Sequence, residues 1–281
     1  MTSVQTDDTP LLVERSGSVV RLVLNRPKAG NAINVEMAKA LMDAAIECDE
    51  DPTVRCVVLT GAGRMFCVGG DVKLFSSAGD RIPHLLKELT SYLHSAVSRL
   101  ARMQKPLITV INGPAAGAGF SLALLGDIAL ASQEASFTLA YGKLGLSPDG
   151  GSTWLLPRLI GLRRAQELML TDPTLTARQA VDLGLVTRVC EATDNDPASS
   201  LHIQSATLAE TLARGGVQAW GLTRELLLSS YGAALESHLE AEARAIAIAG
   251  RGAESREGIA AFVERRPADF IAASGPAAKA N

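Results

Sequence analysis

The longest uncharged stretch of the chain is the feature that most limits its possible folds. Residues 106–126 carry no acidic or basic side chain, so the segment is long enough to cross a bilayer as a helix. An Asn-Gly-Pro sequence at 112–114 interrupts it, however, and Gly-Ala-Gly follows at 117–119. The stretch is therefore predicted to form a buried strand, a tight loop and a buried helix inside a globular core.

Composition narrows the chemistry that such a core can support. Apolar residues make up 47% of the chain and charged residues 20%, so a sizeable core is expected. The net charge of −3 argues against a strongly basic nucleic-acid binder. The four cysteines match no zinc or redox spacing, and no pair of the four histidines has the i,i+4 spacing of a metal motif. We therefore expect no metal site. The polar N-terminus and scattered cysteines favour the cytoplasm.

Hydrophobic patterning divides the chain into two parts. Strands and helices alternate over residues 11–196, with Asn34 placed to cap a helix and Thr176 to cap another. Predicted strands lie at 11–15, 18–25, 54–60, 107–111, 128–132, 135–140 and 186–191; predicted helices lie at 35–47, 82–103 and 118–125. A polar break at 194–200 then leads to a helical region, 197–281. The class is α/β with a helical C-terminal part.

Two glycine-rich loops, 61–71 and 112–119, each follow a predicted buried strand. Neither completes a dinucleotide fingerprint, because Phe66 and Leu122 stand where the third glycine belongs, and neither closes as a phosphate-binding P-loop. A serine-hydrolase elbow at Ser121 is disfavoured because Ser121 lies ten positions after Ile111, the end of the preceding predicted strand. The loops are either simple tight turns or two sources of free backbone N–H groups that form an oxyanion hole.

Six ordered segments resemble the crotonase superfamily, also called the enoyl-CoA hydratase/isomerase family. They lie between about Val13 and Phe270, at residues 24–34, 54–72, 105–128, 137–161, 175–189 and 256–270. The resemblance implies a crotonase-like spiral of ββα units with a C-terminal helical trimerisation region. It also implies a homotrimer or a dimer of trimers that acts on acyl-CoA thioesters. Coenzyme A enters as part of the substrate, with no permanently bound cofactor and no nucleic-acid or membrane partner.

The resemblance also assigns roles to individual positions. It implies that the backbone N–H groups of Cys67 and Ala118 form the oxyanion hole. The positions implied to contact substrate or coenzyme A are Lys28, Ala29, Gly69, Gly70, Asp71, Ser121 and Tyr141. The stretch between about Leu74 and Leu93 corresponds to a variable pocket wall, so it is predicted to set acyl specificity.

The positions of the acidic residues distinguish the hydratases of the family from its isomerases. Hydratases of the family use two glutamates, but Ser121 and Tyr141 stand at those positions here. Asp149 replaces a glycine at the position where family isomerases carry their acid. Residues 142–158 most resemble the 1,2-epoxyphenylacetyl-CoA isomerases. The predicted function is therefore an acyl-CoA isomerase with Asp149 as proton shuttle. The alternatives are a hydratase, a dehalogenase or decarboxylase, a silent acyl-CoA binder, or Asp149 as a simple turn or cap residue.

Overall fold

The computed structural model describes residues 9–191 and 197–275, and its centre is a six-stranded sheet. In spatial order the strands are β1 (Leu11–Ser16), β2 (Val19–Leu24), β3 (Cys56–Gly61), β4 (Leu107–Ile111), β6 (Ile128–Ser132) and β9 (Arg188–Cys190). The hairpin strand β1 is antiparallel to β2, and all other neighbours are parallel. Parallel strands are normally covered on both faces, which explains why β3 and β4 are almost entirely apolar and buried.

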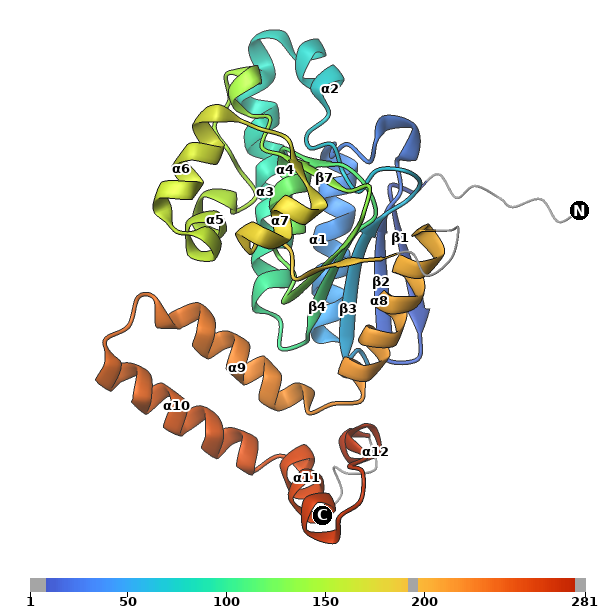
Figure 1. The fold of residues 1–281 in the computed structure, drawn as a ribbon, viewed down its shortest axis with the longest axis vertical. Helices are drawn as coiled ribbons and strands as arrows, with labels where there is room; N and C mark the ends of the chain where they lie inside the picture. Colours follow the sequence, from blue (N-terminus) through green and yellow to red (C-terminus); the bar gives the residue numbers. More distant parts are fainter. Residues whose placement is uncertain (1–8, 192–196, 276–281) are drawn as a thin grey trace, which may run out of the picture.

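Helices cover both faces of this sheet (Figure 1). On one face, α1 (Val35–Glu50) and α3 (Ile82–Arg102) pack together on the main hydrophobic core. On the other face, α8 (Pro197–Ala213) buries Leu201 and Ala209 against β3, β4 and β6. The predicted cap is confirmed, because the Asn34 side chain accepts a hydrogen bond from the Met37 N–H at the start of α1.

The uncharged stretch runs through the middle of the molecule. It forms β4, the short strand β5 (Ala115–Ala116) and the helix α4 (Ala118–Ala123), in which every residue is buried. With β7 (Ser136–Thr138) and β8 (Leu175–Thr176), β5 forms a second sheet of three strands. Among the described residues, no helix is long and apolar enough to cross a membrane. The prediction of a buried strand, loop and helix is confirmed.

Shorter helices surround the two sheets. They are η1 (Pro27–Ala29), α2 (Val72–Ser77), η2 (Gly79–Arg81), η3 (Gly142–Leu144), α5 (Ser152–Ile160), α6 (Leu162–Thr171) and α7 (Ala177–Leu183). Thr176 caps α7 as predicted, in a capping box with Gln179. Hydrophobic patterning did not predict α2, α5 or α6. Glycines with positive φ precede both α5 and α6, and Pro157 lies inside α5, so local signals there favour a loop.

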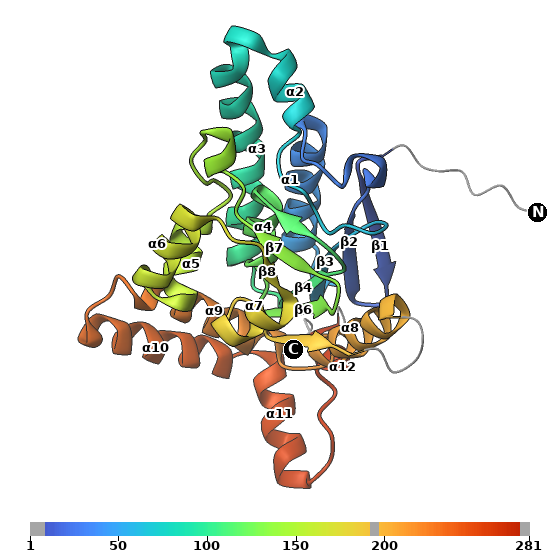
Figure 2. The ribbon, with the colours of Figure 1, turned by 45° about the horizontal axis from the view of Figure 1, so that its top comes forward.

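The last four helices form an arm that extends from the sheets (Figures 1 and 2). They are α9 (Val217–Ser230), α10 (Leu235–Gly250), α11 (Ala253–Glu264) and α12 (Phe270–Ser274). A buried ion pair of 2.8 Å between Arg55 and Glu254 ties α11 to the start of β3. The predicted boundary at 196/197 adjoins residues 192–196, which lie outside the described part of the chain. The division at that boundary stays a prediction.

Candidate active site

The two glycine-rich loops lie against each other beyond the ends of β3 and β4. Cys67 pairs with Ala115 in an isolated bridge, and the Ala116 N–H donates to the Cys67 carbonyl oxygen at 2.9 Å. Gly119 packs so closely on the same carbonyl that a Cβ at this position would overlap it. Gly69 has φ +98°, and a Cβ there would lie 2.9 Å from the Ala116 oxygen. Glycine is required at both positions because the two backbones touch.

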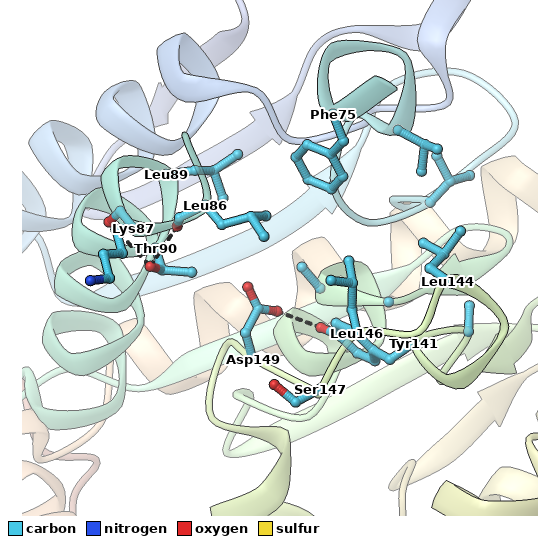
Figure 3. Close-up of a pocket in the computed structure, with 16 residues that line it drawn as sticks. Phe75, Leu86, Lys87, Leu89, Thr90, Tyr141, Leu144, Leu146, Ser147 and Asp149 are labelled. Carbon is cyan, nitrogen blue, oxygen red and sulfur yellow. Dashed lines mark hydrogen bonds between the residues drawn. The ribbon is translucent and has the colours of Figure 1, made fainter. Parts of the chain in front are cut away.

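A cavity of about 230 Å³ opens beside these loops. Figure 3 shows side chains from α2, α3 and the segment around η3 directed toward it. Its lining residues are Val68, Gly70, Val72, Phe75, Leu86, Lys87, Leu89, Thr90, Gly117, Ala118, Ala140, Tyr141, Leu144, Leu146, Ser147 and Asp149. Most of these are apolar, and α2 and α3 supply the wall that the sequence predicted between Leu74 and Leu93. A mostly apolar cavity with a few polar groups is typical of small-molecule sites.

Two backbone N–H groups on the cavity wall are free to bind a ligand. Within the described ranges, neither the Gly70 N–H nor the Ala118 N–H donates to a protein acceptor. Gly70 comes from the first loop and Ala118 from the second. The arrangement provides one unpaired donor from each loop, as an oxyanion hole requires.

The predicted donor in the first loop is wrong. The Cys67 N–H donates to the Pro114 carbonyl oxygen at 3.2 Å, and Cys67 is fully buried and absent from the cavity wall. The error is a shift of three residues, because the bridge between the loops uses the Cys67 N–H and leaves that of Gly70 free. Burial also raises the pKa of the Cys67 thiol to about 12, so this side chain is not a ready nucleophile.

Asp149 is the acidic residue on the cavity wall, and hydrogen bonds from several groups fix its position. The Tyr141 hydroxyl donates to Asp149 Oδ1 at 2.5 Å. The Asp149 carbonyl oxygen accepts from Ser121 Oγ at 2.8 Å and from Ser152 Oγ at 3.1 Å. The next residue is held as well, because the Gly150 N–H donates to His94 Nε2 at 3.2 Å. Asp149 is therefore a fixed group at the cavity.

Ser121 and Tyr141, the two positions at which family hydratases carry glutamate, differ in their surroundings. Ser121 is fully buried, lies outside the cavity wall and uses its hydroxyl on the Asp149 backbone, so its predicted substrate contact is wrong. Tyr141 lines the cavity. Burial, reinforced by the neighbouring Asp149 carboxylate, raises the pKa of Tyr141 and keeps its phenol protonated.

The residues predicted to contact coenzyme A lie beside the first loop. Asp71 caps α2 through the Leu74 N–H at 3.3 Å and forms an ion pair with Arg26 at 3.0 Å. Lys28 and Ala29 lie exposed in η1 and are not part of the cavity wall. The structure thus gives Asp71 a structural role in α2, while coenzyme A contacts at Lys28 and Ala29 stay predictions.

Comparison with known proteins identifies the fold and the family. The family profile described as Enoyl-CoA hydratase/isomerase matches residues 14–272.

The chain belongs to the enoyl-CoA hydratase/isomerase family.

Individual members support this assignment. The 1,2-epoxyphenylacetyl-CoA isomerase of Escherichia coli (strain K12) is 39% identical over 90% of this chain and 94% of its own length. A probable enoyl-CoA hydratase of Rhodobacter capsulatus is 34% identical over 92% and 96%. The crystal structure of an enoyl-CoA hydratase from Polaromonas sp. JS666 superposes with a TM-score of 0.85 at 31% identity, covering 92% of this chain and 98% of that one. The predicted crotonase fold and family are confirmed, and the family acts on coenzyme A thioesters.

Proposed function

We propose that this member of the enoyl-CoA hydratase/isomerase family is an isomerase that shifts a double bond of an enoyl-CoA thioester. One observation carries the proposal: a fixed carboxylate, Asp149, shares a cavity with the free N–H groups of Gly70 and Ala118. A carboxylate can take up a proton, and two N–H donors stabilise the negative oxygen that results. The similarity to the isomerase from Escherichia coli supports the same reaction class.

The proposed reaction needs no atoms beyond those of the substrate. The thioester oxygen accepts hydrogen bonds from the Gly70 and Ala118 N–H groups. Asp149 removes a proton from C2, the C2–H electron pair enters the thioester, and a dienolate forms. The proton then returns from Asp149 to C4, so the C3–C4 double bond becomes a C2–C3 double bond conjugated with the thioester. One carboxylate is enough because the proton is returned rather than lost.

A hydratase is the main alternative within the family. Hydration needs a group that activates water as well as a proton donor. Ser121 is already committed to the Asp149 backbone, and Tyr141 stays protonated next to Asp149. The site therefore supports isomerisation better than hydration. Dehalogenation, decarboxylation and silent acyl-CoA binding remain alternative outcomes of the assay below.

The substrate enters as a coenzyme A ester, without a separately bound cofactor. We assign the acyl group to the apolar part of the cavity, between Phe75, Leu86 and Leu146 (Figure 3). We assign coenzyme A to the neighbourhood of the first loop, where Lys28, Ala29, Gly69 and Asp71 are the proposed contacts.

An assay with purified protein tests this function directly. A panel of 3-enoyl-CoA, 2-enoyl-CoA, halogenated aryl-CoA and malonyl-type CoA esters is incubated with the protein and followed by mass and by ultraviolet absorbance. A product of unchanged mass that gains the absorbance of the conjugated thioester is expected. A gain of water instead contradicts the proposal in favour of a hydratase, and binding without any turnover identifies a silent binder.

We further propose that the protein is a homotrimer or a dimer of trimers, assembled through the helical arm. The arm exposes large apolar side chains that a monomer would leave in water. Phe262, Val263 and Ile246 are 86%, 75% and 74% exposed. Large apolar side chains that are exposed on one part of a protein often mark a protein–protein contact, and these three lie on the neighbouring helices α10 and α11.

Replacing Phe262 by Glu is expected to weaken this assembly. A charge at the centre of an apolar contact has to be desolvated when subunits meet, so the variant should shift toward monomers. Light scattering after size-exclusion chromatography measures the mass. Val13→Glu, an equally apolar-to-acidic change at an exposed position of β1, is the control and should leave the mass unchanged. An unchanged mass for the Phe262 variant would rule out a contact at this residue.

A further inference from the structure

The two oxygens of the Asp149 carboxylate have different surroundings. Oδ1 accepts the Tyr141 hydroxyl at 2.5 Å. Oδ2 accepts no hydrogen bond from the residues in the described ranges, and in Figure 3 it points away from Tyr141 into the cavity. One oxygen of the carboxylate is therefore hydrogen-bonded to the protein. The other faces the cavity, where a substrate would lie.

The direction of this hydrogen bond is fixed by burial. Loss of solvent around the Tyr141 ring raises the pKa of the phenol, and the nearby Asp149 charge raises it further. Tyr141 is therefore a permanent donor. Oδ1 stays an acceptor whether Oδ2 carries a proton or not, because the raised pKa of Tyr141 keeps the proton on the phenol oxygen.

The Asp149 backbone is already held by neighbouring side chains. Its carbonyl oxygen accepts hydrogen bonds from Ser121 and Ser152, and the Gly150 N–H is bound to His94. The freedom that remains is rotation about the Asp149 side-chain bonds. A single hydrogen bond from Tyr141 to Oδ1 removes that rotation.

We propose that Tyr141 is a positioning residue, whose hydroxyl orients Asp149 so that Oδ2 alone takes and returns the substrate proton. This inference rests on the proposed isomerase function. Without the hydroxyl, the carboxylate rotates and spends less time aimed at the substrate carbon. The effect falls on the chemical step rather than on binding, since the hydroxyl is engaged by Asp149 and not by the ligand.

The Tyr141→Phe variant tests the proposal because it keeps the ring and removes only the donor. A hydrogen bond to a charged group contributes enough that kcat should fall roughly tenfold to a hundredfold. KM should stay within about twofold, since ground-state binding is untouched. Exchange of the C2 protons of butyryl-CoA in D2O, followed by mass, should slow by the same factor, because it reports proton removal alone. Tyr231→Phe, at the exposed end of α9 and outside the cavity wall, is the matched control and should match the wild type.

The outcomes separate this inference from the proposed function. If the wild type neither isomerises enoyl-CoA esters nor exchanges C2 protons, the proposed function fails. If the wild type is active and Tyr141→Phe keeps its kcat and exchange rate, the positioning role is refuted while the function stands. A loss that appears only as a higher KM assigns Tyr141 to substrate binding and also overturns the proposal.

Discussion

The Asp149→Ala variant is expected to lose nearly all isomerase activity while it still binds acyl-CoA esters. A positioned general base typically contributes 10² to 10⁴ in rate, so kcat should fall by about that factor. Binding should persist because the cavity wall is mainly apolar and the two backbone donors are unchanged. Steady-state kinetics on a 3-enoyl-CoA ester measures the first effect. Calorimetric titration with butyryl-CoA, which has no double bond to shift, measures the second.

Asp149→Asn separates the charge of this residue from its shape. The amide oxygen can still accept the Tyr141 hydroxyl, so the local structure should be kept, whereas a neutral amide is not a base. We expect the same loss of kcat as for Ala. Asp43→Asn, on the exposed face of α1, is the control for removing one carboxylate. Full activity in Asp149→Asn would contradict the proton-shuttle role.

The Ala118→Pro variant is expected to remove one half of the oxyanion hole. Ala118 is the first residue of α4, a position at which helices accept proline because its N–H has no helical partner. Loss of one such donor typically costs 10²–10³ in rate. We expect kcat/KM to fall by at least about a hundredfold. The donor is lost, and the proline ring also fills the place of the N–H.

A second proline substitution provides the matched control. Ala253 is the first residue of α11, far along the chain in the helical arm, and its N–H also lacks a backbone acceptor in the described part of the protein. Ala253→Pro should therefore keep the wild-type kcat/KM. Equal thermal midpoints for both variants would show that the loss in Ala118→Pro is not due to unfolding. Wild-type activity in Ala118→Pro would remove this residue from the oxyanion hole.

Most of the sheet was predictable because its signals are local. Buried parallel strands such as β3 and β4 are short β-branched and aliphatic runs, and Asn34 and Thr176 are recognisable caps. By contrast, α5 contains Pro157 and follows Gly151 in the left-handed region, so its sequence resembles a loop. Its burial of Leu156 and Ile160 in the core stabilises it as a helix.

Some of the site residues could also be predicted from the sequence, whereas others could not. The sequence alone placed Ala118, Gly70 and Asp149 among the functional positions, because loop composition and the family motifs mark them. It assigned the first-loop donor to Cys67, since a backbone N–H has no signature in side-chain identity. Which N–H is free depends on which one the opposite loop uses, and Pro114 uses that of Cys67.

The residues by themselves therefore determined the fold class and the family, and they singled out Asp149 as the carboxylate of the proposed site. Only the tertiary structure decided how the groups work together. It placed Ser121 behind Asp149 rather than in the cavity, and joined Tyr141 to one oxygen of the carboxylate. The reason is physical: hydrophobic periodicity and chain turns are encoded locally, whereas hydrogen-bond pairing between distant segments exists only after the loops have packed.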